Sequence, residues 1–126
     1  NNFINIFVDD KALRKQIMGI QTDSTPLEDP KNPDTCNCFA LYKLLATPEE
    51  TEVMKTNYLG GNYGYGHAKQ ELFELIVEKF KNEREKYNYY INNLEEVDKL
   101  LLEGAAKASA VANGVLKRVR EKLGYE

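Results

Sequence analysis

The chain has 126 residues, of which 17 are basic and 20 acidic, so its formal net charge at pH 7 is −3. This length suits one domain with a modest hydrophobic core. The charge excludes a protein that binds nucleic acid over its whole surface, so any such contact must come from a local basic patch. No apolar run approaches the roughly 20 residues of a membrane span, and no secretory signal opens the chain. We therefore expect no membrane association.

The first part of the chain predicts one helix followed by a linker. Asp9 or Asp10 can cap a helix over about 11–20, because either carboxylate can accept bonds from the free amides of the first turn. The stretch 21–33 contains three prolines, which forbid regular helix. The chain begins with Asn1 and not methionine, and we expect it to be the interior of a longer protein.

Two further helices follow the linker. Apolar spacing predicts a helix over 37–45. Thr47 can cap the next helix and Pro48 suits its first position, and the two glutamates that follow favour the positive end of the helix dipole. This third helix should stop near Tyr58, because two glycines come shortly after it.

The two cysteines, Cys36 and Cys38, are two residues apart. A disulfide between such close neighbours would be strained, so we expect reduced thiols and a cytoplasmic protein. Structural zinc needs four ligands at characteristic spacings, and the chain has no second cysteine pair. The pair therefore predicts buried thiols at the start of a helix more strongly than a metal site.

The stretch 57–66 contains four glycines and three tyrosines. Phosphate-cradling loops follow a strand and carry a lysine next to serine or threonine, and neither feature occurs here. The stretch therefore predicts a turn packed by tyrosines. His67, the one histidine of the chain, lies at the following helix start and predicts a structural role there.

Two long helices complete the chain. The first starts near His67, and the asparagine pair at 92–93 should end it. The second asparagine and Glu96 have capping-box spacing, and the last helix then runs to Gly124. Small residues dominate 104–114, so another helix could approach closely. The predicted fold is all-α, a helical bundle whose two long C-terminal helices pack antiparallel.

No catalytic, cofactor-binding or metal-binding residue is predicted. Nucleophilic catalysis needs a base close to the nucleophile, and the single histidine has no recognisable partner. The carboxylates are predicted to lie on solvated helix faces beside lysine and arginine.

The second half of the last helix is basic. Between 105 and 122 the only acidic residue is Glu121, which leaves a net charge of +5 − 1 = +4. The basic residues are Lys107, Lys117, Arg118, Arg120 and Lys122. Cations also favour a helix C-terminus through the dipole, which explains those after 116 but not Lys107.

A cluster of aromatic and basic residues occurs near the end of the preceding helix. Arg84 and Lys86 lie beside Tyr87, Tyr89 and Tyr90. Aromatic side chains can stack on unpaired RNA bases, although tyrosines at such positions more often belong to the core or its rim. The residues alone thus predict an all-α binding or packing domain with a candidate RNA contact.

An ordered set of local motifs resembles the bacterial-type tryptophanyl-tRNA synthetases over nearly the entire chain. The motifs are Thr22-Asp23-Ser24, Asn37-Cys38-Phe39-Ala40-Leu41-Tyr42, Gly64-Tyr65-Gly66-His67-Ala68-Lys69, Glu103-Gly104-Ala105-Ala106-Lys107-Ala108 and Val119-Arg120-Glu121-Lys122-Leu123-Gly124. The opening 1–7 is similar to the segment directly after the family's ATP-binding lysine-methionine-serine-lysine-serine loop, which this chain lacks.

The resemblance implies that residues 1–126 are the single C-terminal, tRNA anticodon-binding domain of a class I synthetase whose catalytic nucleotide-binding domain is absent here. The full-length enzyme would use ATP and magnesium to attach tryptophan to tRNA(Trp), whereas this fragment alone would be inactive. The implied partners are tRNA(Trp), the catalytic domain and, in a homodimer, a second subunit.

The candidate tRNA-binding residues are chosen from the family motifs and from the basic clusters. Lys69 and Lys107 lie in motifs that match the family, and charge adds Arg84, Lys117 and Arg118. Two alternatives remain open from the sequence. One is a structural or dimerisation module without RNA contact, favoured by the small residues of 104–114, and the other is an unrelated helical domain with a metal at the cysteines.

Overall fold

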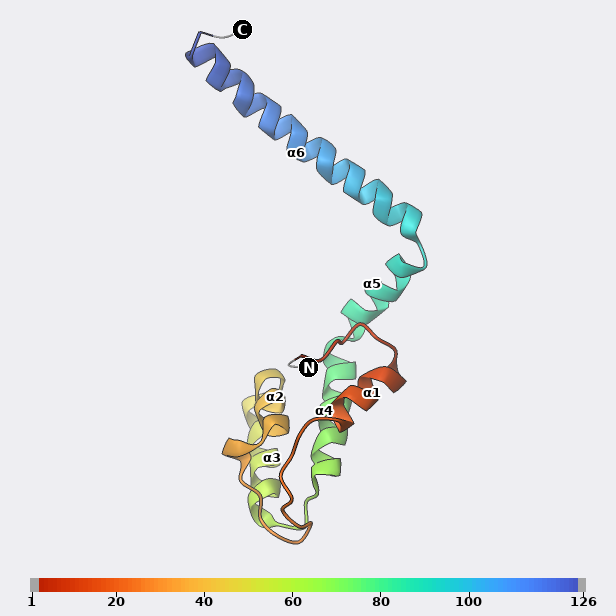
Figure 1. Ribbon diagram of the computed structural model, residues 1–126, viewed down its shortest axis with the longest axis vertical. Coiled ribbons are helices and arrows are strands. Elements are labelled where there is room, and N and C mark those ends of the chain that lie inside the picture. The colour runs from red at the N-terminus through yellow and green to blue at the C-terminus, as the bar shows by residue number, and fades with distance from the viewer. Residues whose placement is uncertain (1–2, 125–126) are drawn as a thin grey trace. The chain divides into compact units, whose positions relative to one another are not determined.

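The computed structural model describes residues 3–124, so Asn1 and Asn2 of the motif-bearing opening lie outside the described residues. All regular structure within 3–124 is helical, which confirms the all-α prediction (Figure 1). The elements are α1 (Asp10–Met18), the 3-10 turn η1 (Pro33–Thr35), α2 (Asn37–Leu45), α3 (Pro48–Gly60), α4 (Tyr65–Lys79), α5 (Lys81–Ile91) and α6 (Leu94–Lys122). None of the described helices is long and apolar enough to cross a membrane. The chain divides into two compact units, Asn1–Glu85 and Lys86–Glu126.

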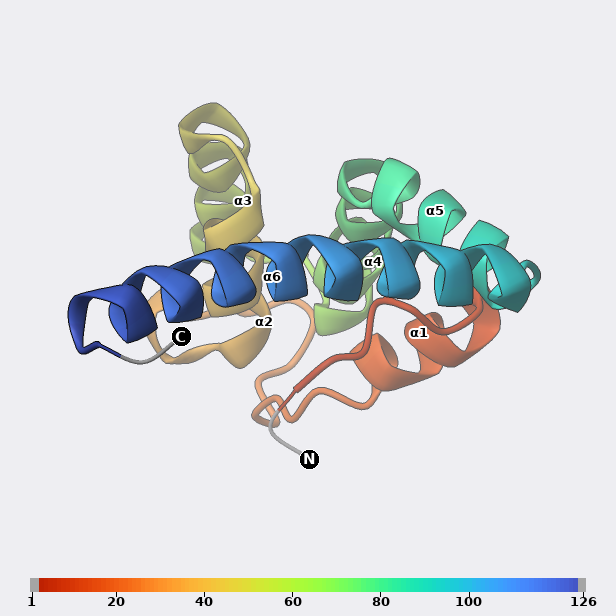
Figure 2. The same ribbon diagram turned by 90° about the horizontal axis from the view of Figure 1, so that it is seen from above.

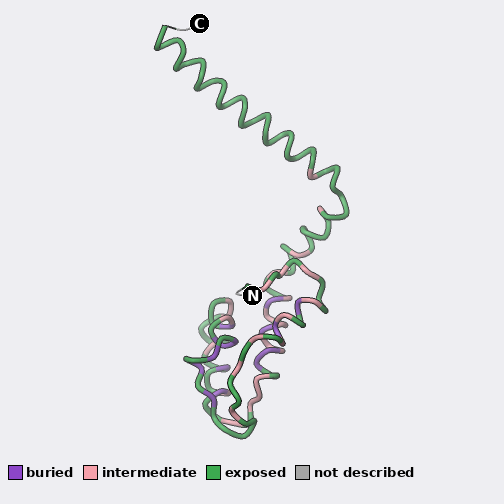
Figure 3. Tube along the Cα trace, viewed as in Figure 1, coloured by how far each residue is buried: buried purple, intermediate pink, exposed green. Residues whose placement is uncertain are grey.

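The first unit is built around α4, which packs against both α1 and α2, while α3 packs on α2 (Figures 1 and 2). Its buried residues come from all four helices and from the turn before α2 (Figure 3). The largest fully buried side chains are Leu13, Ile17, Cys38, Met54, Tyr58 and Leu72. Burying a large apolar side chain contributes about 1.5–3 kcal/mol, so each large apolar member of this cluster stabilises the unit on that scale.

Local sequence signals set the helix starts. The Asp9 carboxylate accepts a hydrogen bond from the Ala12 amide at 2.7 Å and caps α1. At α3, the Thr47 hydroxyl accepts from the Glu50 amide at 3.2 Å, and the Glu50 carboxylate accepts from the Thr47 amide at 2.9 Å. Two free amides are thereby satisfied reciprocally. Both predicted starts are confirmed.

The helix ends differ from the prediction in three places. α1 stops at Met18 because Gly19 caps it, and α3 continues to Gly60. The predicted helix up to residue 91 is two helices, with Phe80 between them at φ −103° and ψ 19°. Phe80 is half-buried and packs against the core at this break.

The predicted capping box at the start of α6 is wrong. The Asn93 side chain does not cap the helix but donates to the Tyr89 carbonyl at 2.6 Å. The Glu96 carboxylate accepts from the Tyr89 hydroxyl instead of reaching back to the Asn93 amide.

The second unit contains the end of α5 and the 29 residues of α6, and none of the α6 residues is buried (Figure 3). The apolar residues that recur every three or four positions on one side of α6 are therefore exposed, with Leu101 at 65%, Val115 at 45% and Val119 at 45% of full exposure. Antiparallel packing of the long helices stays a prediction.

Candidate nucleic-acid interface

Lys69 is buried inside the first unit. Its side chain is about 9% exposed, and its ammonium donates to the carbonyls of Met18 at 3.0 Å and Ile20 at 2.7 Å. These carbonyls lie at and just after the end of α1, where a cation satisfies acceptors that the helix leaves free. This geometry favours a structural role for Lys69.

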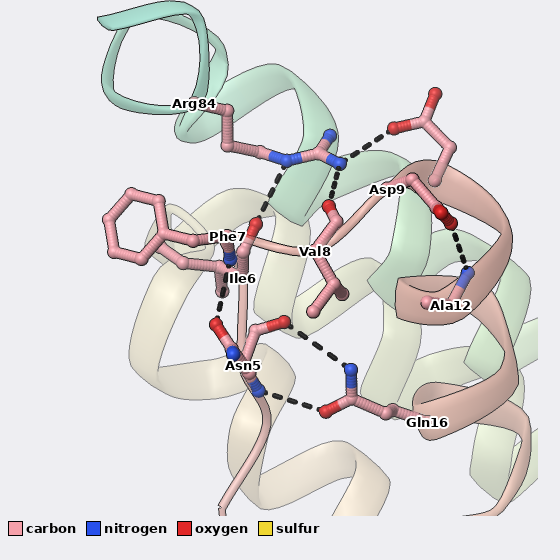
Figure 4. Close-up of polar contacts among 9 residues, drawn as sticks. Asn5, Ile6, Phe7, Val8, Asp9, Ala12, Gln16 and Arg84 are labelled. Carbon is pink, nitrogen blue, oxygen red and sulfur yellow. Dashed lines mark hydrogen bonds and ion pairs between the residues drawn. The ribbon is translucent and has the colours of Figure 1, made fainter. Parts of the chain in front are cut away.

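Arg84 also makes its hydrogen bonds within the first unit. Its guanidinium donates to the carbonyls of Ile6 at 2.9 Å and Val8 at 2.8 Å, and it forms an ion pair with Asp10 at 2.7 Å (Figure 4). The Arg84 side chain is only 12% exposed. The sequence grouped Arg84 with the neighbouring tyrosines, whereas the structure directs it to the N-terminal segment.

Lys107, Lys117 and Arg118 are exposed on α6. Lys107 and Arg118 are three helical turns apart, so they share one side of α6 with about 16 Å between them along the axis. Val111 and Gly114 lie between them on that side, and the Val111 side chain is 69% exposed. The structure thus places two cations about three turns apart on one side of α6, with Lys117 next to one of them.

Charge is distributed unevenly along α6. The part before residue 105 carries Lys99 against four acids, which gives +1 − 4 = −3, and the part from 105 carries +4. The acids are Glu95, Glu96, Asp98 and Glu103. This arrangement matches the helix dipole, and it confines any attraction for a polyanion to the second half of the helix.

The tyrosines before α6 are fixed and partly exposed. The Tyr89 ring is 50% exposed, packs edge-on against Tyr90 at 5.3 Å between centroids, and donates its hydroxyl to Glu96. That hydrogen bond raises the pKa of Tyr89 above its usual value, so the hydroxyl stays a donor. An exposed, fixed ring of this kind can pack on a base or on another protein surface.

The glycine-rich stretch is a tyrosine-packed turn, as the sequence predicts. Tyr58 is fully buried, and its ring lies 5.7 Å from that of Tyr63 and 6.3 Å from that of Tyr65. His67 accepts a hydrogen bond from the Gly64 amide at 3.2 Å and stacks on Tyr63. The histidine therefore has the predicted structural role at the start of α4.

The cysteines are both buried and reduced at the start of α2. The Cys36 sulfur lies 3.3 Å from the Tyr58 hydroxyl, and burial raises the pKa of Cys38 to about 12. The described residues hold no group of three or more histidine, cysteine, aspartate or glutamate side chains that could bind a metal.

Comparison with known proteins gives a consistent result, although no family model matches the chain. Over 98% of its length the chain is 44% identical to the tryptophan–tRNA ligase of Fusobacterium nucleatum and 42% identical to that of Rhodopirellula baltica. The crystal structure of tryptophanyl-tRNA synthetase from Campylobacter jejuni superposes with a TM-score of 0.88 at 41% identity. This chain is a homologue of the C-terminal helical part of tryptophanyl-tRNA synthetases.

The chain spans about two fifths of the length of these synthetases, 38% for the Fusobacterium nucleatum protein and 40% for the Campylobacter jejuni structure. A second structure of the Campylobacter jejuni synthetase is complexed with ADP and tryptophan, and it too matches over 98% of this chain. The family resemblance of the sequence motifs is thereby confirmed.

The sequence did not reveal the buried Lys31. Its ammonium donates to the carbonyls of Pro26, Leu27 and Asp29 at 3.0–3.3 Å and lies 5.4 Å from the centre of the Tyr65 ring. The ammonium thereby holds the proline-containing linker in a fixed shape. Because its partners are main-chain carbonyls, no residue type in the sequence marked this site.

Proposed function

We propose that residues 1–126 act as one tRNA-binding domain of a tryptophan–tRNA ligase. The observation that carries the proposal is 44% identity to a ligase of this kind over 98% of the chain. The remaining three fifths of such a protein would contain the site that activates tryptophan with ATP and magnesium. On this proposal the chain contributes binding and not the chemical step, and it is inactive alone.

The basic half of α6 is the surface proposed to contact tRNA, through Lys107, Lys117 and Arg118. All three are exposed, whereas Lys69 and Arg84 donate to main-chain carbonyls of the first unit. Lysine and arginine on phosphates release counterions, so each such contact steepens the salt dependence of binding. We therefore restrict the proposed interface to these three residues.

The test measures affinity for tRNA(Trp) as a function of salt in the full-length protein that contains this chain. Lys107→Ala and Arg118→Ala should each weaken binding and reduce the magnitude of the log–log salt slope by roughly one. Lys99→Ala is the matched control, because Lys99 is exposed on the acidic half of the same helix. If both variants keep the wild-type affinity and slope, the proposed surface is wrong.

A second candidate role is mechanical support, and the exposed apolar stripe of α6 favours it. Leu101, Val115 and Val119 recur on one side of the helix and are 45–65% exposed. We infer that this stripe packs against the catalytic part of the full-length protein, which would also form a homodimer. Leu101→Ser should then lower the melting temperature of the full-length protein while leaving the tRNA salt slope unchanged, and an unchanged melting temperature would exclude this packing.

A further inference from the structure

The N-terminal segment 3–9 has no regular secondary structure, yet it is fastened to the first unit. Ile4, Ile6 and Val8 alternate along it and pack against the core. The Asn5 amide donates to the Gln16 side chain at 2.9 Å, and the Gln16 amide group donates back to the Asn5 carbonyl at 3.4 Å (Figure 4). The segment is therefore tied to α1 by its side chains and by its backbone.

Arg84, from a distant part of the sequence, also binds the N-terminal segment 3–9 to the first unit. The segment turns at residues 6–8, where the Phe7 amide donates to the Asn5 side chain at 3.0 Å, and one guanidinium reaches the Ile6 and Val8 carbonyls together. The same nitrogen that binds Val8 pairs with Asp10, which is 70% exposed. The planar fork of arginine fits this set of three acceptors, and the single ammonium of lysine fits it less well.

We propose that Arg84 is a positioning residue for the aminoacylation reaction, an inference that rests on the proposed function. In that function the catalytic part precedes this segment, so residues 3–9 are the covalent path between the reaction site and the helical domain. By holding the Ile6 and Val8 carbonyls, Arg84 fixes the direction in which the chain leaves the domain. Small misplacements of a bound substrate relative to the reacting groups are costly, because catalysis depends on orientation.

The proposed mechanism assigns Arg84 an effect on turnover and not on tRNA affinity. The Arg84 side chain is 12% exposed and its guanidinium donates to two main-chain carbonyls and to Asp10, so it has little access to RNA. Loss of the fastening would let the helical domain, with its bound tRNA, sample several orientations relative to the catalytic part. The tRNA would bind as before, but its acceptor end would be correctly placed for a smaller fraction of the time.

The experiment uses the full-length protein that contains this chain, with Arg84→Gln and Arg84→Lys as variants. Arg14→Gln is the matched control, because Arg14 is also an arginine of the first unit and its guanidinium donates to the Gln70 side chain at 3.1 Å. Arg84→Gln should lower kcat for aminoacylation about tenfold and leave the Kd for tRNA(Trp) within about twofold. Arg84→Lys should recover part of the loss, because an ammonium can still donate to one or two of the acceptors.

The outcomes are separable. If the wild-type protein shows no tryptophan-dependent ATP–pyrophosphate exchange, the proposed function fails and this inference fails with it. If the wild type is active and Arg84→Gln keeps its kcat within about twofold, the inference alone is overturned. A parallel loss of kcat, tRNA affinity and melting temperature that Arg84→Lys does not restore would show general destabilisation, and this result also overturns the positioning role.

Discussion

Gly61 is the position where the backbone demands glycine most strongly. It follows α3 with φ 73° and ψ 176°, a combination that essentially only glycine adopts. A Cβ added there would lie 2.5 Å from the Glu28 carbonyl oxygen. Gly61→Ala therefore costs about 1–3 kcal/mol of backbone strain. Relief of the clash moves Glu28 and weakens its 3.3 Å hydrogen bond from the Asn62 amide, which adds about 1 kcal/mol.

The expected loss in the free energy of unfolding is thus about 2–4 kcal/mol. Gly60→Ala is the matched control, because a Cβ at this last residue of α3 would meet nothing within 4 Å. Replacing a helical glycine by alanine should stabilise the chain by about 0.5–1 kcal/mol. Urea unfolding of the chain, monitored by far-ultraviolet circular dichroism, measures the free energy of unfolding of both variants. If Gly61→Ala is as stable as Gly60→Ala, the strain argument is refuted.

Three further predictions concern buried or hydrogen-bonded charged groups. Lys69→Met should lower the free energy of unfolding by about 1–3 kcal/mol, because the carbonyls of Met18 and Ile20 lose their donor. The control is Lys43→Met on the exposed surface of α2, which should change the free energy of unfolding by less than about 0.5 kcal/mol. Burial raises the pKa of Cys38 from 9.0 to about 12. The contribution of the neutral thiol to stability is therefore present below pH 9.0 and is lost as the pH rises toward about 12. Cys38→Ala should reduce the pH dependence of the free energy of unfolding, measured with urea, in that window. Hydrogen bonds from Thr25 and then Tyr65 lower the pKa of Asp23 from 3.8 to about 2, so its contribution is present above pH 3.8 and is lost as the pH falls toward about 2. Asp23→Asn should therefore flatten the acid dependence of the melting temperature.

The helix starts could be predicted because their signals are local. Asn37–Leu45 was predicted with the bounds that the structure gives it. Thr47, Pro48 and Glu50 lie within four residues, and their capping interactions depend only on the backbone that they start. The end of α4 was not predicted, and Phe80 at this break packs against a core formed largely by residues distant in the sequence.

The roles of the buried cations could not be read from the sequence. Lys69 donates to carbonyls 49 and 51 residues away, and Arg84 to carbonyls 76 and 78 residues away. A main-chain carbonyl is present at every residue, so its position leaves no trace in residue type. A cation that fastens the backbone and a cation that contacts RNA therefore look alike in the sequence, and only burial separates them.

The two roles proposed for α6 do not compete for the same side of the helix. At about 100° per residue, Lys107, Lys117 and Arg118 lie about 100–160° around the axis from the middle of the stripe that contains Leu101 and Val119. An apolar stripe gains free energy by leaving water, whereas lysine and arginine lose it when they are buried without partners. Packing of the stripe against protein would leave the cations in solvent, where a polyanion can reach them. Fixing one face of α6 would therefore hold the other in a defined orientation for tRNA, so that support and recognition reinforce each other.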